Sequence, residues 1–235
     1  DGGTMVERLW AKDPTLWSVD EDKRDSIQKR LGWLAAPAWL RDHIGELRER
    51  VSKIQALNWQ RVVLLGMGGS SLAPAVLAQI AATGSTGPRF EILDSTHPDT
   101  VRRATAHEDL ANTLFLVSSK SGTTLEVMAL WSYFDGLLRT DAAAANGPSR
   151  NFVAITDAGT PLEALARDRG FLDCFVNPLD VGGRFSALTY FGIVPAALLG
   201  FDLNQLLESA ERQALSCQAR ATEKNNTLLF GWRIG

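Results

Sequence analysis

The stretch LFLVSSKSGTTLE, residues 114–126, shows how this chain is built. It begins with an apolar run of strand length, passes through small or charged polar residues at 118–124, and continues into a helix-like segment. A strand that is apolar throughout is typical of a parallel sheet covered on both faces. A plain turn needs a single Gly or Asp. Hydroxyls at nearly every position beside Lys120 therefore predict a turn that binds a ligand.

The same order of strand, turn and helix recurs from Arg61 onward. The expected strands are 62–65, 90–93, 114–117, 152–155 and 174–176, with helices near 71–83, 98–109, 123–138 and 160–169. This pattern predicts an α/β fold, a three-layer αβα sandwich around a five-stranded, parallel, doubly wound sheet. Numbered along the chain, the expected strand order is 2-1-3-4-5. Residues 139–150 are expected to form a surface loop.

Helices are expected on both sides of this sheet-forming region. Ser18 and Glu21 match a capping box before a segment with Ile27, Leu31 and Leu34 on one face. Pro37 opens a longer helix whose apolar stripe (Leu40, Ile44, Leu47, Val51 and Ile54) covers too few heptads for a coiled coil and favours docking on the domain. After Arg184, helices near 186–199 and 203–221 are separated by Gly200, a C-cap residue. The resulting division is an N-terminal helical segment (1–57), a domain (58–202) and C-terminal helices (203–235).

The composition excludes several classes of protein. The 235 residues are 45% hydrophobic and carry a net charge of −3, so no basic field indicates a nucleic-acid partner. The apolar runs are too short for a membrane span, and no secretory signal opens the chain. Cys174 and Cys217 are expected to be buried free thiols in a reducing cytosol, and the three scattered histidines form no metal site. The stripe in NNTLLFGWRIG (225–235) is unfinished, so we expect the chain to be part of a longer protein.

The first of three turns whose residues suggest a function is LLGMGGSSLAP, residues 64–74. Its glycines let the backbone approach a ligand, and the helix that follows directs free N–H groups at it. A dinucleotide fingerprint is the rival interpretation, but Ser71 stands where the third glycine belongs. A tight turn with no ligand remains a further alternative.

The second turn is the opening stretch. Ser119, Ser121 and Thr124 can each donate a hydrogen bond, and the amides around Gly122 can form an anion-binding nest. Phosphate has several acceptor oxygens that match these donors, whereas the residue order of a Walker loop is absent. Glu126 is interpreted as a partner of the helix dipole. In a 2-1-3-4-5 sheet, strands 1 and 3 are neighbours where the chain reverses direction, so both turns should meet at one crevice.

The third turn lies in NPLDVGGRFSALTYFG, residues 177–192. Gly182 and Gly183 allow a sharp bend, and Arg184 follows them at the same edge of the sheet. A guanidinium there can stabilise an oxyanion. The alternative is a surface salt bridge.

At these residues the sequence resembles the phosphoglucose isomerase family. GMGGSSLAP, SSKSGTTLE and VGGRFSALT occur in the order and approximate spacing of that family's signatures. The resemblance covers about residues 5–235, the first of the family's two sugar-isomerase (SIS) domains. DPTLWS and RLGWL resemble the isomerase portion of fused transaldolase–isomerase proteins.

The resemblance implies a reversible conversion of glucose 6-phosphate to fructose 6-phosphate through an enediol, in glycolysis and gluconeogenesis in the cytoplasm. It implies that Arg184 stabilises the enediolate, without cofactor or metal, and that the full-length protein is compatible with a homodimer. The substrate contacts would be Gly69, Ser70, Ser119, Lys120, Ser121, Thr124 and Gly183.

Gly122 stands where some relatives carry a bulky residue, a departure that should not affect phosphate binding. The larger difference concerns the catalytic residues. The family's glutamate base, ring-opening histidine and C-terminal lysine all lie beyond Gly235, so the chain is expected to be inactive by itself. A non-catalytic sugar-phosphate sensor and a nicotinamide dinucleotide-binding domain are the alternatives.

Overall fold

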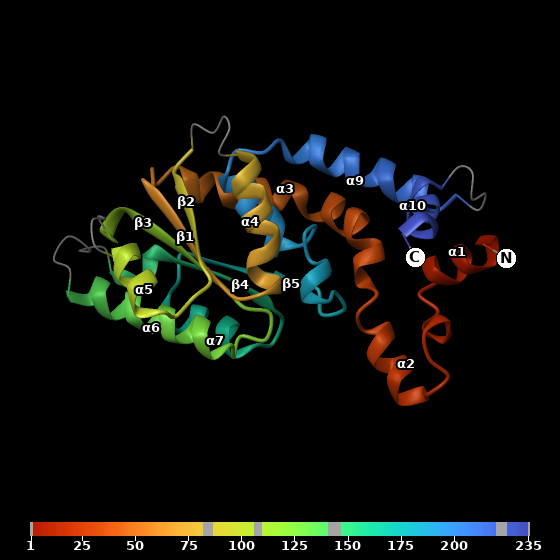
Figure 1. The fold of residues 1–235 in the computed structure, drawn as a ribbon. Coiled ribbons are helices and arrows are strands. Elements are labelled where there is room, and N and C mark those ends of the chain that lie inside the picture. Colours follow the sequence, from red (N-terminus) through yellow and green to blue (C-terminus); the bar gives the residue numbers. More distant parts are fainter. Residues whose placement is uncertain (1, 82–86, 106–109, 141–146, 220–224, 235) are drawn as a thin grey trace. The chain divides into compact units, whose positions relative to one another are not determined.

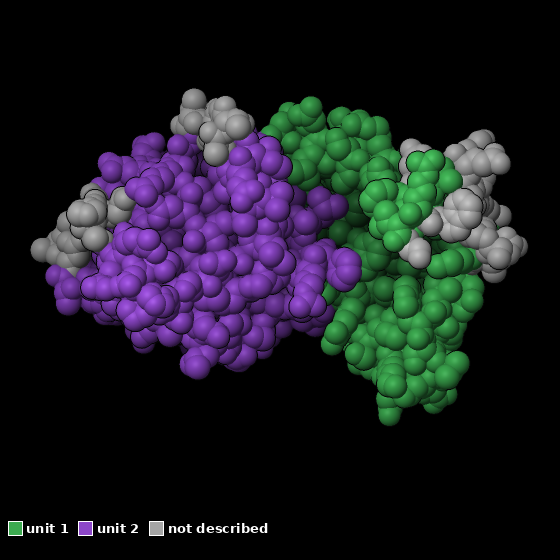
Figure 2. Space-filling view, in the orientation of Figure 1, with its two compact units in different colours: residues 1–44, 180–182, 202–235 green, residues 45–179, 183–201 purple. Residues whose placement is uncertain are grey.

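The computed structural model describes residues 2–81, 87–105, 110–140, 147–219 and 225–234. The chain forms two compact units (Figure 2). Unit 1 comprises residues 1–44, 180–182 and 202–235, and unit 2 comprises residues 45–179 and 183–201.

A five-stranded sheet lies at the centre of unit 2 (Figure 1). Its strands are parallel and follow the order β2-β1-β3-β4-β5, as predicted from the sequence. Their bounds are β1 Arg61–Gly66, β2 Arg89–Leu93, β3 Thr113–Ser118, β4 Phe152–Asp157 and β5 Asp173–Asn177. Every residue of β1, β3 and β4 is buried, because helices cover both faces of the central strands.

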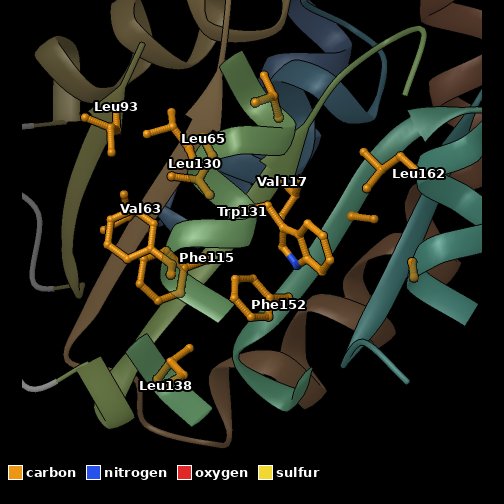
Figure 3. Close-up of a cluster of buried hydrophobic side chains, with 14 of the residues drawn as sticks. Val63, Leu65, Leu93, Phe115, Val117, Leu130, Trp131, Leu138, Phe152 and Leu162 are labelled. Carbon is orange, nitrogen blue, oxygen red and sulfur yellow. The ribbon is translucent and has the colours of Figure 1, made fainter. Parts of the chain in front are cut away.

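One face of the sheet packs against α5 (Pro98–Thr105), α6 (Leu125–Thr140) and α7 (Pro161–Arg169). The core between them is strongly aromatic (Figure 3). The ring of Phe115 lies 4.5 Å from that of Phe134 on α6 and 5.4 Å from that of Phe152 on β4. Alternate strand residues such as Val63, Phe115 and Val117 face this layer.

The opposite layer contains α4 (Gly69–Ala81) and α8 (Tyr190–Leu198), which contact each other and the strands. Asn177 at the end of β5 fixes the start of α8, because its side-chain oxygen accepts a hydrogen bond from the Tyr190 amide at 2.8 Å. The later part of α3 (Ala36–Gln55) docks beside β5: Arg50 pairs with Asp173 at 2.6 Å and lies over the Phe175 ring. Docking of this helix, predicted from its short apolar stripe, is thereby confirmed.

Unit 1 is built from helices and short connecting segments. It holds α1 (Gly2–Trp10), η1 (Pro14–Leu16), α2 (Glu21–Gln28), η2 (Gly32–Ala35), the start of α3, α9 (Leu203–Cys217) and α10 (Asn226–Ile234). Segment 180–182 belongs to it through an antiparallel bridge between Leu31 and Val181 and a 2.8 Å bond from the Gly32 amide to the Asp180 carbonyl. The helices in the described ranges include none long and apolar enough to span a membrane.

The predicted capping box at Ser18 is wrong. Asp20 is the N-cap of α2, since its carboxylate accepts from the Asp22 amide, while the Ser18 hydroxyl accepts from the Asp20 amide. The helix also ends at Gln28, so the buried Leu31 and Leu34 lie beyond it, Leu31 in the bridge to Val181 and Leu34 in η2. An Asp directly before an acidic first turn is the stronger cap, which the spacing rule for Ser and Glu overlooked.

Other sequence expectations differ in detail. Helix α8 begins at Tyr190 rather than 186, because Thr189 is its N-cap: the Thr189 backbone is extended and its hydroxyl accepts from the Phe191 amide. Residues 183–185 form the short helix η5. Gly200 adopts a φ of +84° directly after the C-cap residue Leu199, which confirms a glycine stop between α8 and α9. Both cysteines are free, though only partly buried. Helix α9 ends at Cys217 rather than 221. Parts of the expected helices 71–83, 98–109 and 203–221 and of the loop 139–150 lie outside the described residues.

Candidate functional site

A cavity of about 450 Å³ opens at the carboxyl edge of the sheet in unit 2. It is formed by the turns that follow β1, β3, β4 and β5, so segments far apart in sequence contribute to one site. The lining residues are Met67, Gly69, Ser70, Lys120, Ser121, Thr124, Asp157, Ala158, Thr160, Leu179 and Gly183.

The sheet register brings the first two turns together. Gly66, the last residue of β1, pairs with Ser118, the last residue of β3, so both turns leave the sheet at the same level. The Ser118 hydroxyl then donates to the Ser70 carbonyl at 3.2 Å, which ties the end of β3 to the first turn of α4. The predicted meeting of the two turns at the switch point is therefore present in the geometry.

The turns after β1 and β5 touch backbone to backbone. A Cβ placed on Gly69 would lie 2.6 Å from the Gly183 carbonyl carbon, a distance that no side chain tolerates. The Ser186 hydroxyl donates to the Gly183 carbonyl at 2.5 Å and fixes the bend from the other side. Glycine at position 69 is thus required for this close approach of the two turns.

In the turn after β3, one hydroxyl points inward and two line the cavity. Ser119 is only 1% exposed; its Oγ accepts from the Gly122 amide at 3.1 Å and lies 2.9 Å from Thr124 Oγ1. Ser119 therefore holds the shape of the turn, while Ser121 and Thr124 line the cavity. Gly122 has a φ of +66°, and a Cβ there would meet the Leu162 amide nitrogen at 2.8 Å, so the glycine is needed for this turn to form.

In the turn after β1, the two adjacent serines have different surroundings. Ser70 lines the cavity at the start of α4. Ser71, at the position of the missing third glycine, turns back to donate its hydroxyl to the Gly68 carbonyl at 3.1 Å. Ser70 is thus the hydroxyl of this pair that a ligand can reach.

Lys120 and Asp157 form an ion pair at the cavity. Asp157, the last residue of β4, is buried, and burial raises the pKa of its carboxyl group, against the opposing effect of Lys120. Sequence reasoning missed Asp157 and the nearby Thr160. The available signal was a strand ending in a polar residue at the same sheet edge as the other turns.

Arg184 lies beside the cavity and does not line it. It is exposed in η5, next to the lining residue Gly183, and within the described part of the chain it has no hydrogen bond or ion pair. The alternative interpretation as a salt bridge therefore finds no support among the described residues. In those same ranges, no group of His, Cys, Asp and Glu could hold a metal ion.

Comparison with known proteins gives a consistent result. A family model described as phosphoglucose isomerase matches residues 40–233. A protein named glucose-6-phosphate isomerase from Thermus thermophilus is 36% identical over 202 residues, covering 83% of this chain and 46% of its own length. One from Nostoc is 30% identical over 98% of this chain and 42% of its own. The chain thus spans less than half the length of these curated relatives.

Two solved structures resemble the fold. A hypothetical protein from Thermus thermophilus has a TM-score of 0.78 and 32% identity, covering 96% of this chain and 51% of its own. A glucose-6-phosphate isomerase from Chlamydia trachomatis has a TM-score of 0.66 and covers 94% of this chain and 40% of its own, and at 23% identity it supports the fold alone.

Proposed function

The chain belongs to the phosphoglucose isomerase family, and we propose that it is the sugar-phosphate-binding part of a glucose-6-phosphate isomerase. In the full-length protein this part would bind glucose 6-phosphate and fructose 6-phosphate during their interconversion. Both the substrate and the activity are part of this proposal, because the chain spans less than half the length of the relatives that carry that name.

One observation carries the proposal: hydrogen-bond donors from two separate turns line the same cavity. Ser70 comes from the turn after β1, and Ser121, Thr124 and Lys120 come from the turn after β3. A phosphate group accepts several hydrogen bonds at once and favours a cation beside them. Helices α4 and α6 also begin at this cavity, and their N-terminal ends favour an anion.

Isomerisation moves a proton between two adjacent carbons of the open-chain sugar, with negative charge developing on oxygen. Arg184 is the residue proposed to stabilise that charge, because its guanidinium is exposed and uncommitted among the described residues. The reaction also needs a positioned base. Asp157 lines the cavity, but its carboxylate is buried and bound to Lys120, so we assign it no such role.

Calorimetric titration of the purified chain tests the proposal. Fructose 6-phosphate should bind with modest, roughly millimolar affinity, since an open site cannot exclude water from the sugar. NAD should not bind at that concentration. Binding of NAD in preference to fructose 6-phosphate would contradict the proposal and restore the dinucleotide interpretation.

A double variant locates the phosphate. Ser70→Ala with Thr124→Val removes two donors, each worth roughly 1.5–3 kcal/mol to a charged oxygen, so affinity for fructose 6-phosphate should fall at least tenfold. Thr140→Ala is the matched control, because it removes a hydroxyl from the opposite end of α6. Unchanged affinity in the double variant, with folding intact, would place the phosphate elsewhere.

A further inference from the structure

We propose that Asp157 neutralises Lys120 while the cavity is empty and thereby makes anion binding depend on the uptake of a proton. The inference rests on the proposed function, because it requires that the anion binds beside Lys120.

Of the two side chains in this ion pair, that of Lys120 is the more exposed and the freer to move. Asp157 Oδ2 accepts from Lys120 Nζ, and the Asp157 amide donates to the Lys120 carbonyl at 3.3 Å. The Asp157 side chain is 8% exposed and that of Lys120 is 36% exposed. The carboxylate is therefore fixed at the end of β4, while the ammonium group at the cavity can turn toward a ligand.

The second carboxylate oxygen of Asp157 does not share in the ion pair with Lys120. Asp157 Oδ1 is buried and has no hydrogen-bond partner among the described residues. A buried carboxylate normally accepts several hydrogen bonds, because leaving it under-bonded is costly. The negative charge of Asp157 thus depends on Lys120 for its balancing cation.

An anion in the cavity would compete for that cation. When Lys120 bonds to the anion, Asp157 is left charged, buried and close to a second negative charge. Both effects favour the protonated carboxyl group, and burial already raises the pKa of Asp157 in the empty site. Binding is therefore accompanied by proton uptake, and affinity increases as the pH falls, by at most about tenfold per pH unit for one proton.

The charged groups on the elements that follow β3, β4 and β5, or next to the lining residues in sequence, must be distinguished from Asp157 in the test. Glu126 lies in the first turn of α6 and Glu163 in the first turn of α7, where Glu163 accepts from the Gly159 amide. Arg184 lies in η5. Asp180 follows β5, belongs to unit 1 and pairs with Lys12 at 3.2 Å.

Sulfate is the suitable probe, because it remains a dianion across the tested range, unlike phosphate. Its affinity for the wild-type chain, measured by calorimetry between about pH 5 and pH 8, should rise as the pH falls. Titrations in two buffers of different ionisation enthalpy should show protons taken up on binding. A pH-independent affinity, or binding without proton uptake, would overturn the inference.

Variants then assign the effect to one side chain. Asp157→Asn should bind sulfate about tenfold more tightly than wild type at pH 8, since a like charge beside the anion is removed, and its affinity should be independent of pH. Lys120→Met should bind sulfate weakly at every pH. Asp135→Asn is the matched control, because Asp135 is also a buried carboxylate paired with a cation, Arg139, on α6 away from the cavity. It should keep the wild-type profile.

The remaining outcomes are also decisive. Weaker sulfate binding by Asp157→Asn, or a pH dependence that disappears in Glu126→Gln, Glu163→Gln or Asp180→Asn, would contradict the assignment. If Asp157→Asn fails to fold, the two-buffer titration of the wild-type chain still tests the inference, because binding of sulfate without proton uptake would contradict it. A wild-type chain that binds neither sulfate nor fructose 6-phosphate refutes the proposed function, whereas one that binds both without proton uptake refutes only this inference.

Discussion

Lys120 and Arg184 have different surroundings, which fits the different roles proposed for them. Lys120 is paired with a buried carboxylate at the cavity, whereas Arg184 is exposed beside it and has no partner among the described residues. A paired ammonium suits the binding of a phosphate that competes for it. An uncommitted guanidinium suits the stabilisation of charge that develops only during the reaction.

Replacement of Arg184 by lysine tests this division. In a full-length protein that contains this chain, Arg184→Lys keeps the positive charge but loses the planar fork of donors. We expect kcat to fall roughly 10²-fold or more, by analogy with the loss of one oxyanion-stabilising donor, with a smaller change in KM. Steady-state kinetics would show the split. A near-normal kcat with a raised KM would reassign Arg184 to ground-state binding.

At the residue scale, the sequence predicted much of the cavity. Gly69, Ser70, Lys120, Ser121, Thr124 and Gly183 line it. Ser119 was expected among the donors but faces inward, because a hydroxyl pattern does not show which members satisfy the turn's own backbone. Asp157 was missed because its partner lies 37 residues earlier, and only the pairing of β3 with β4 brings them together.

At the scale of elements, the cavity depends on two turns that meet without side chains between them. Gly69 begins α4 and Gly183 begins η5, and their backbones approach more closely than any Cβ would permit. The positions of Ser70 and Arg184 relative to each other are therefore set by this contact.

Gly69→Ala should disrupt that contact. The added methyl group must push the two turns apart, which typically costs about 1–3 kcal/mol of stability, and affinity for fructose 6-phosphate should fall. Gly136→Ala is the matched control: its Cβ would meet nothing within 4 Å on an exposed position of α6, so it should raise stability by about 0.5–1 kcal/mol. Chemical denaturation and calorimetry measure both effects. Equal stability of the two variants would contradict the close approach.

The elements themselves were predictable to different degrees. The five strands were found within one or two residues, because each is an apolar run bounded by polar or glycine-containing turns. The N-terminal segment was predicted less well. Leu31 and Leu34 are spaced as on a helix, yet Leu31 bridges to Val181, a tertiary contact that no local pattern contains.

At the scale of the whole molecule, the proposed sugar-phosphate site has no assigned base. The purified chain should bind sugar phosphate and fail to convert it, since loss of a general base alone typically costs about 10²–10⁴-fold in rate. A coupled isomerase assay, checked for host enzyme, tests this expectation. Turnover that co-purifies with the chain and is lost in Arg184→Ala would require a base within residues 1–235.

The order of the strands also has a consequence for synthesis of the chain on the ribosome. Strand β1 can pair with β2 as soon as Leu93 has emerged, but its other edge stays open until β3 ends at Ser118, twenty-five residues later. At about 5–20 residues per second, that interval lasts about 1–5 s. During it, the apolar edge of Val62–Leu65 is exposed to other nascent chains. We therefore expect this edge of β1 to be most open to unwanted strand pairing before β3 has been synthesised.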